Sequence, residues 1–191
     1  MIQNWISTLI SSIEKLKEEY KLDTRTIINE DDLKFGIRNK LHLVDDEKDM
    51  LIKPEVPWYD QDFLGKQVKF YFDLAILKKS VFELQFRNAT LNNKGYYYDD
   101  ISLAIMMKFA KPNFRFAEIG EDLDKLRIFA IQTAKEADKQ CPCLIIGCSD
   151  EILYQQSITV LSNELKRFTE EIIKRFVIII FSQDNIEILQ S

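Results

Sequence analysis

Glycine and histidine are scarce in this chain of 191 residues, and their scarcity excludes several chemistries. The five glycines are so widely spaced that neither a GxGxxG nor a GxxxxGK[ST] phosphate-binding loop can be built. With a single histidine, there is neither an HExxH motif nor a Cys/His zinc site. We interpret that residue, His42, which lies between Leu41 and Leu43, as a partly buried structural residue.

The few cysteines and the short apolar runs bear on where the protein works. Cys141, Cys143 and Cys148 surround the apolar stretch LIIG. Three thiols cannot all pair, so we expect reduced thiols in the core rather than a CxC metal or redox site. The longest apolar run, FVIIIF at residues 176–181, is far shorter than the roughly 20 residues of a membrane span. The amino terminus has no basic segment before its apolar residues, so we expect a cytoplasmic protein that does not contact membranes.

The net charge is negative, but its distribution is uneven. The chain has 26 Lys and Arg against 31 Asp and Glu, a net charge of -5, which argues against a protein that binds nucleic acid by phosphate neutralisation alone. Residues 64–95 reverse this sign, since they contain six basic residues and only two carboxylates, Asp73 and Glu83. We therefore look for chemistry around these two carboxylates.

Hydrophobic periodicity predicts one domain over residues 1–191, with a helical amino-terminal part at 1–65 and a core at 66–182. Residues 4–20 have an amphipathic helical pattern, and residues 21–65 predict short helical pieces followed by an extended segment around Pro54 and Pro57. We expect further helices at 97–109, 123–139 and 157–175, and buried strands at CLIIGC (143–148) and FVIIIF (176–181). The predicted fold class is α/β (α+β), with a central mixed sheet flanked by helices.

Two alternating runs predict a β-hairpin. From residue 66 to 76 the apolar and polar residues alternate, and SVFELQFR at 80–87 alternates again. A three-residue loop places Asp73 opposite Glu83, and a four-residue loop places it opposite Gln85. Both registers gather these three side chains on one face of a half-buried hairpin.

Facing carboxylates repel unless a cation or proton lies between them. Asp73, Glu83 and the backbone carbonyl of Leu84 offer three oxygens, the kind of partial ligand set that Mg²⁺ completes with water and substrate phosphate. Such a metal activates a water and stabilises a pentavalent phosphate. Gln85 is placed to hydrogen-bond that water or the scissile phosphate. A surface hairpin whose carboxylates merely face solvent remains the alternative.

The segment DLAILKKSVFELQF resembles the PD-(D/E)xK nuclease superfamily, in the D…ExQ variant of some type II restriction endonucleases. Those enzymes place the Asp and the ExQ or ExK pair on adjacent strands. The resemblance implies a restriction-endonuclease-like catalytic core and hydrolysis of phosphodiester bonds in double-stranded DNA. It also implies Mg²⁺, with Mn²⁺ as a substitute, held by Asp73 and Glu83, and it assigns the ExK lysine position to Gln85.

The segment departs from the family pattern in two places. Gln85 stands where most members have lysine, and no literal Pro-Asp dipeptide is present, since Pro57 precedes Asp60 by three residues. Asp60 is therefore the second candidate for the first metal ligand or for an added acid. In many relatives a glutamate of the first helix approaches the metal, a role that falls here to Glu14 or Glu18.

The small size, the net negative charge and the lack of a DNA-reading motif narrow the type of nuclease. The chain looks most like the small catalytic subunit of a heterodimeric type IIS restriction endonuclease. On that resemblance it cleaves one strand when docked with a large subunit that reads the DNA site. The alternatives are a self-sufficient homodimeric type II enzyme and a non-catalytic interaction module whose carboxylates bind a basic partner.

Overall fold

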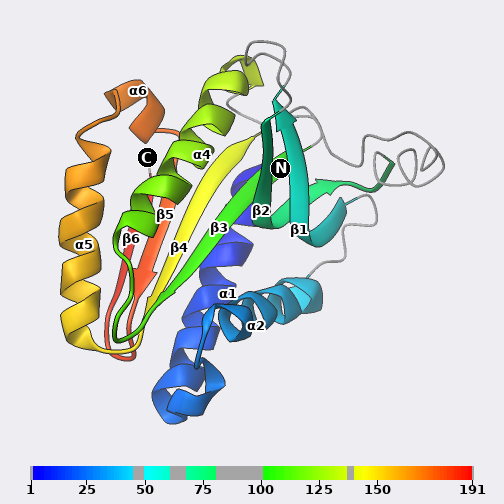
Figure 1. Cartoon of the computed structure of the whole chain (residues 1–191). Helices are drawn as coiled ribbons and strands as arrows, with labels where there is room; N and C mark the ends of the chain where they lie inside the picture. The colour runs from blue at the N-terminus through cyan, green and yellow to red at the C-terminus, as the bar shows by residue number, and fades with distance from the viewer. Residues whose placement is uncertain (1, 45–49, 61–67, 81–100, 137–139, 191) are drawn as a thin grey trace.

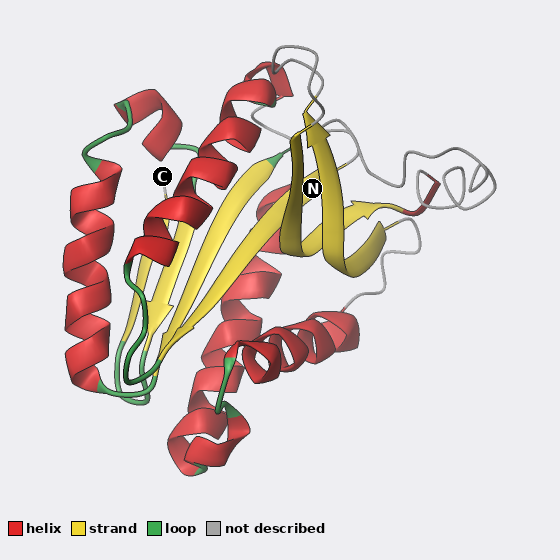
Figure 2. Cartoon of the chain, viewed as in Figure 1, coloured by secondary structure: helices red, strands yellow, loops and turns green. Residues whose placement is uncertain are grey.

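The computed structural model describes residues 2–44, 50–60, 68–80, 101–136 and 140–190, which form one mixed sheet with helices on both faces (Figures 1 and 2). The predicted α/β class is confirmed. The strands are β1 (Met50–Asp60), β2 (Val68–Lys78), β3 (Ile101–Ala110), β4 (Cys141–Cys148), β5 (Val177–Phe181) and β6 (Ile186–Gln190). The helices are α1 (Ile2–Leu22), α2 (Glu30–Val44), α4 (Ala117–Gln132), α5 (Glu151–Leu165) and α6 (Glu170–Ile173), with 3-10 turns at Thr24–Thr26 and Ala134–Glu136.

The strands follow one another across the sheet in chain order, β1-β2-β3-β4-β5-β6. β1 is antiparallel to β2, and β2 to β3. β3, β4 and β5 run parallel to one another, and β6 is again antiparallel to β5. Parallel neighbours need a long crossover, which α4 supplies between β3 and β4, and α5 between β4 and β5.

Each face of the sheet carries its own apolar core. Leu9 and Ile13 of α1 and Leu33 of α2 pack with Ile105 and Ile145 of the sheet. On the other face, residues of α4 and α5 pack with Ala104, Met106, Leu144 and Ile146. Because a strand between two cores has both faces covered, β4 is buried at every position.

Several predicted elements are confirmed. The helix expected at 4–20 is α1, the strands expected at 143–148 and 176–181 are β4 and β5, and the extended segment around Pro54 and Pro57 is β1. Both prolines are tolerated because β1 is an edge strand. The helix predicted at 157–175 is wrong in its bounds, since Asp150 caps α5 by accepting from the Leu153 N–H at 2.9 Å. The helix predicted at 123–139 likewise begins earlier, at Ala117.

The helix predicted at 97–109 is wrong. Residues Ile101–Ala110 form β3, in the middle of the sheet. Leu103, Ile105 and Met107 belong to one core, whereas Ala104 and Met106 belong to the other. A strand that is apolar on both faces shows no alternation in the sequence, so its pattern does not distinguish a strand from a buried helix. The strand β6 was not predicted.

The predicted hairpin register is also wrong for the part of the hairpin that the structure describes. Leu74 to Leu77 pair with β1 along one edge and with β3 along the other, so no further strand can pair with this stretch. Residues 81–87 lie outside the described residues. The expectation of a half-buried strand fails as well, because every residue from Phe72 to Leu77 is buried.

All three cysteines are free and buried, as predicted. Burial raises the pKa of Cys141 and of Cys148 to about 12, and raises that of Cys143 as well. Because the thiolate is the reactive form, we expect a thiol-specific disulfide reagent at pH 8 to leave the native protein unlabelled and to titrate three thiols in denaturant. Rapid labelling of one thiol in the native protein would contradict this.

The side chain of His42 lies outside the described residues. None of the helices in the described part of the chain combines the length and the apolar character that a membrane crossing requires.

Candidate functional site

The strands β2 and β3 separate part-way along the sheet. Their pairing runs from Leu77 and Ile101 to Leu74 and Ile105, and there it ends. From that point β2 continues alongside β1, while β3 continues alongside β4 as far as Ala110. Figure 1 shows the β1–β2 pair turning away from the other strands. We call the place where the two strands separate, between residues 68–73 of β2 and 106–110 of β3, the fork.

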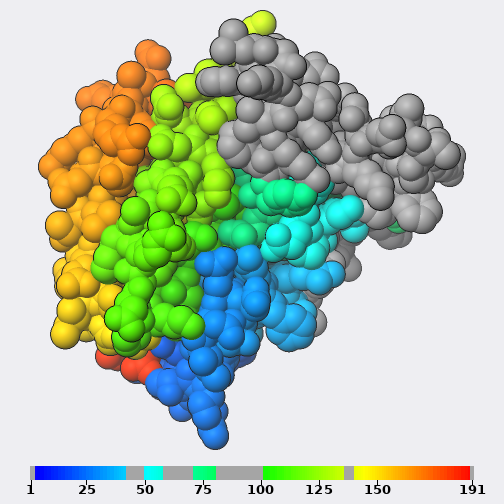
Figure 3. Space-filling view, in the orientation of Figure 1, coloured from blue at the N-terminus to red at the C-terminus, as the bar shows by residue number. Residues whose placement is uncertain are grey.

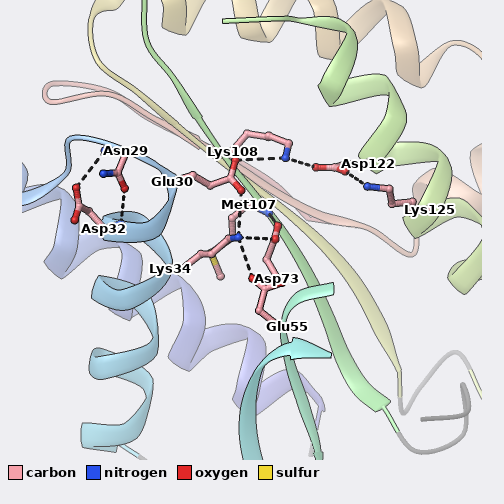
Figure 4. Close-up of polar contacts among 10 residues, drawn as sticks. All are labelled: Asn29, Glu30, Asp32, Lys34, Glu55, Asp73, Met107, Lys108, Asp122 and Lys125. Atoms are coloured by element: carbon pink, nitrogen blue, oxygen red, sulfur yellow. Dashed lines mark hydrogen bonds and ion pairs between the residues drawn. The ribbon is translucent and has the colours of Figure 1, made fainter. Parts of the chain in front are cut away.

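Asp73 lies at the fork and is only 8% exposed. Its Oδ2 accepts a hydrogen bond from the backbone N–H of Met107 at 2.6 Å, so the side chain satisfies a donor of β3 where the strand pairing has ended. Its Oδ1 lies 2.9 Å from the Nζ of Lys34 (Figure 4). A buried carboxylate with both oxygens engaged is held in one orientation.

The backbone of β1 changes direction beside Asp73. Glu55 has a φ of 50°, in the left-handed region that few non-glycine residues adopt. Pro54 pairs with Leu74 and Val56 with Phe72, but Glu55 and Asp73 between them form no such pair. The two residues that flank Asp73 in the chain pack on opposite faces of the sheet. Leu74 lies in the core with α1 and α2, whereas Phe72 lies in the other core. The strict alternation predicted for 66–76 is therefore broken at Asp73.

The ammonium group of Lys34 is surrounded by three carboxylates, which we call the three-carboxylate cluster. Its Nζ lies 2.9 Å from Oδ1 of Asp73, 3.2 Å from Oε1 of Glu30 and 3.2 Å from Oε1 of Glu55. Glu30 and Lys34 meet because they are one turn apart on α2. Burial lowers the pKa of Lys34, but the hydrogen bonds and charges of Asp73, Glu55 and Glu30 outweigh burial and raise it above its ordinary range.

Lys108 of β3 extends the site toward the opposite face of the sheet. Its Nζ lies 3.3 Å from Oε2 of Glu30 on α2 and 3.2 Å from Oδ2 of Asp122 on α4. Asp122 is only 1% exposed, and its Oδ1 also accepts from Lys125 at 2.7 Å. Burial lowers the pKa of Lys108, but the carboxylates of Asp122, Glu30 and Asp73 raise it by more, so this lysine stays charged.

These contacts join seven side chains, which we call the charged network: Glu30, Lys34, Glu55, Asp73, Lys108, Asp122 and Lys125. They come from α2, β1, β2, β3 and α4. In the space-filling view, the atoms of these parts of the chain meet on one face, where blue, cyan to teal and green adjoin (Figure 3). The network therefore joins side chains from five elements.

The donor set of the network can be tested against the Mg²⁺ that the resemblance implies. Glu30, Glu55 and Asp73 offer carboxylate oxygens, the ligands that Mg²⁺ prefers. Their chemistry fits, but the ammonium of Lys34 sets their spacing. Within the described residues, no group of three or more His, Cys, Asp and Glu side chains could hold a metal ion.

The predicted site residues fall in different places. Asp73 lies in the network, whereas Glu83, Leu84 and Gln85 lie outside the described residues. Asp60 ends β1 opposite Val68, roughly 16 Å along that strand from Glu55 at 3.3 Å per residue; its side chain is not described. The roles proposed for Asp60 and for the three residues at 83–85 stay predictions.

The helix glutamate beside Asp73 is not one of the two predicted from α1. Glu14 and Glu18 are both exposed, and Glu18 pairs with Lys17 at 3.5 Å. Glu30 of α2 takes the place beside the site. The sequence contained one signal for the missed residues, since Lys108 is a single charge inside the apolar run Ile101–Ala110.

Comparison of the chain with models of protein families, with curated proteins and with solved structures finds no match.

Proposed function

We propose that this protein is a Mg²⁺-dependent DNA endonuclease subunit whose catalytic site lies at the fork. The observation that carries the proposal is the placement of a buried carboxylate, Asp73 on β2, beside a charged lysine, Lys108 on the adjacent strand β3. The PD-(D/E)xK pattern requires an acid and a lysine on adjacent strands. With Met106, Met107 and Lys108 in the strand next to Asp73, Lys108 is a candidate for the lysine that residue 85 lacks.

The carboxylates of such a site come from unusual positions. Met106 stands where the pattern has an acid, and Glu30 and Asp122 reach Lys108 from helices on the two faces of the sheet. Asp73 and Glu30 would hold the metal, with Glu83 as the further ligand that the ExQ pattern proposes. When bound, a divalent cation supplies an activated water and stabilises charge on the phosphate. Lys108 contributes a fixed positive charge toward the developing negative charge of the phosphate.

The net charge of the chain supports a partner subunit. With a net charge of -5, the protein has little electrostatic attraction for DNA of its own. We propose that a large subunit binds and reads the duplex, and that this chain cleaves one strand within the complex. The basic residues of segment 64–95 are then a local exception in the sequence around Asp73.

The test is strand-resolved cleavage of plasmid DNA in Mg²⁺ by the purified chain, alone and mixed with the large subunit encoded by a neighbouring restriction gene. Cutting of one strand only in the mixture supports the proposal. Site-specific cutting of both strands by the pure chain would instead indicate a self-sufficient homodimeric enzyme. No cutting in either case would leave a non-catalytic interaction module.

Replacing Lys108 by methionine is expected to lower the cleavage rate about 100-fold, because a preorganised charge at the phosphate is lost. Lys40→Met is the matched control, since Lys40 pairs with Glu19 at 2.6 Å and lies outside the charged network. Single-turnover rates at saturating protein measure both. Equal rates for the two variants would remove Lys108 from the catalytic site.

A further inference from the structure

The two edges of the sheet differ in how open they are to another strand. In the part of the chain that the structure describes, the sheet ends at β1 on one side and at β6 on the other (Figure 1). Pairing at β1 is hindered by Pro54 and Pro57, which lack an N–H, and by the left-handed backbone of Glu55. The sequence of β6, IEILQ, contains neither proline nor lysine, and its register with β5 is unbroken. An edge strand without such protection is a template for a further strand.

The turn between β5 and β6 determines which backbone groups of β6 point outward. Ser182 donates its N–H to the C=O of Asn185 at 2.9 Å, so Asn185 directs its backbone groups toward β5. Successive residues of a strand direct these groups to opposite sides. The N–H and C=O groups of Ile186, Ile188 and Gln190 therefore point away from β5, and the described residues place no other strand beside them.

The side chains of β6 are also incompletely covered. Every residue of β5 is buried, whereas Ile186 and Ile188 of β6 are partly exposed and Leu189 is 42% exposed. Ile186 and Ile188 pack, together with Ile10 of α1, against the core between α1 and the sheet. A strand added beside β6 would remove more of this apolar surface from water, which favours its binding.

The strand β6 is complementary to itself when two copies run antiparallel. With Ile188 opposite Ile188 of the second copy, Ile186 lies opposite Gln190, so every outward-pointing residue enters a hydrogen-bonded pair. Each such pair exchanges two hydrogen bonds. The same register places Glu187 opposite Leu189. The alternative register that places Glu187 opposite Glu187 would bring two like charges together, which is destabilising, and would leave Gln190 beyond the strand of the second copy.

We propose that the protein forms a twofold dimer in which β6 pairs with β6 of a second copy and joins the two sheets into one. Twofold symmetry, with the same surface used by both copies, is the commonest arrangement of homo-oligomers. The fork lies outside this interface, because β4 and β5 separate β3 from β6. The inference therefore goes beyond the proposed function and does not rest on it. A dimer that cleaves no DNA overturns only the proposed function, and cleavage by a monomer overturns only the dimer.

Sedimentation equilibrium of the full chain measures the dimer. At about 100 µM, above the micromolar dissociation constants of weak specific interfaces, we expect a mass of twice 22.5 kDa. Ile188→Lys should weaken the dimer at least about tenfold, because it places two ammonium groups directly opposite each other. Leu189→Lys is the matched control on the next residue, since its ammonium would face Glu187 of the second copy, and it should dimerise within a few-fold of the wild type. A monomeric wild type, whose edge would then be left for a strand of another protein, would overturn the inference, as would equal affinities of the two variants.

Cysteine cross-linking tests the same register with milder substitutions, in case Ile188→Lys does not fold. The Cα atoms of a hydrogen-bonded pair lie about 5.5 Å apart, within the range of a disulfide, so Ile188→Cys should form a linked dimer on mild oxidation. Leu189 is more exposed than Ile188, but its two copies are diagonal neighbours about 7 to 8 Å apart, at or beyond that range. The native thiols are buried. If Leu189→Cys links as fast as Ile188→Cys or faster on a non-reducing gel, the proposed pairing is wrong.

Discussion

Asp73→Asn is expected to lower Mg²⁺-dependent cleavage by about 1,000-fold while the protein stays folded. The amide oxygen of asparagine can still accept the hydrogen bond from Met107, so the orientation of the side chain at the fork is kept. Only the negative charge is lost, and with it the ligand that the metal needs. Lys34 retains Glu30 and Glu55 as partners, so the ammonium is not left unpaired.

The measurement compares single-turnover cleavage rates with thermal unfolding of the same preparations. Asp31→Asn is the matched control, because Asp31 is an exposed carboxylate next to Glu30 and lies outside the charged network. It should cleave at the wild-type rate. A variant at position 73 that unfolds normally and still cleaves within a few-fold of the wild type would rule out a catalytic site at the fork.

Asp122→Ala is expected to lower the free energy of unfolding by about 3 kcal/mol, because removal of one member of a buried ion pair leaves its partner uncompensated. Asp122 is almost fully buried on α4 and is shared by Lys108 and Lys125. Glu30 still faces Lys108, which limits the loss. The lost carboxylate also opens the contact between β3 and α4.

Urea unfolding followed by circular dichroism measures this loss. Asp124→Ala is the control on the same helix, since Asp124 is partly exposed and pairs with Arg167 at 3.2 Å near the surface. Such surface pairs contribute about 1 kcal/mol or less. If both variants lose the same small amount, the ion pairs of the network add little to stability.

The sequence predicts best where one face of an element differs from the other, or where an apolar run is short and bounded. The stripe of Leu9, Ile13 and Leu16 shows the amphipathic α1, and the runs CLIIGC and FVIIIF show β4 and β5. The strand β3 is apolar on both faces, and the same pattern suits a buried helix. Because of that ambiguity, the sequence predicts a helix where β3 lies and a different segment as the strand next to β2.

The sequence predicts one residue of the candidate site. The alternating pattern of residues 66–76 points to Asp73, and Asp73 is the carboxylate buried at the fork. Its neighbours Glu30, Lys34 and Lys108 lie 35 or more residues away along the chain and meet Asp73 only through the packing of α2 and β3. No local spacing encodes such a meeting. The kink at Glu55, which redirects the strand, likewise follows from tertiary structure.

The position of α1 has a consequence for the synthesis of the protein. Its apolar residues pack against β3, β4 and β5, and β5 begins at Val177, near the other end of the chain. At about 5 to 20 residues per second, that strand leaves the ribosome on the order of 10 to 30 s after the helix. Until then the apolar stripe of α1 has no completed sheet to cover it. The first core therefore closes only after β5 has been made, and the apolar stripe of the nascent helix lacks its sheet partner during that interval.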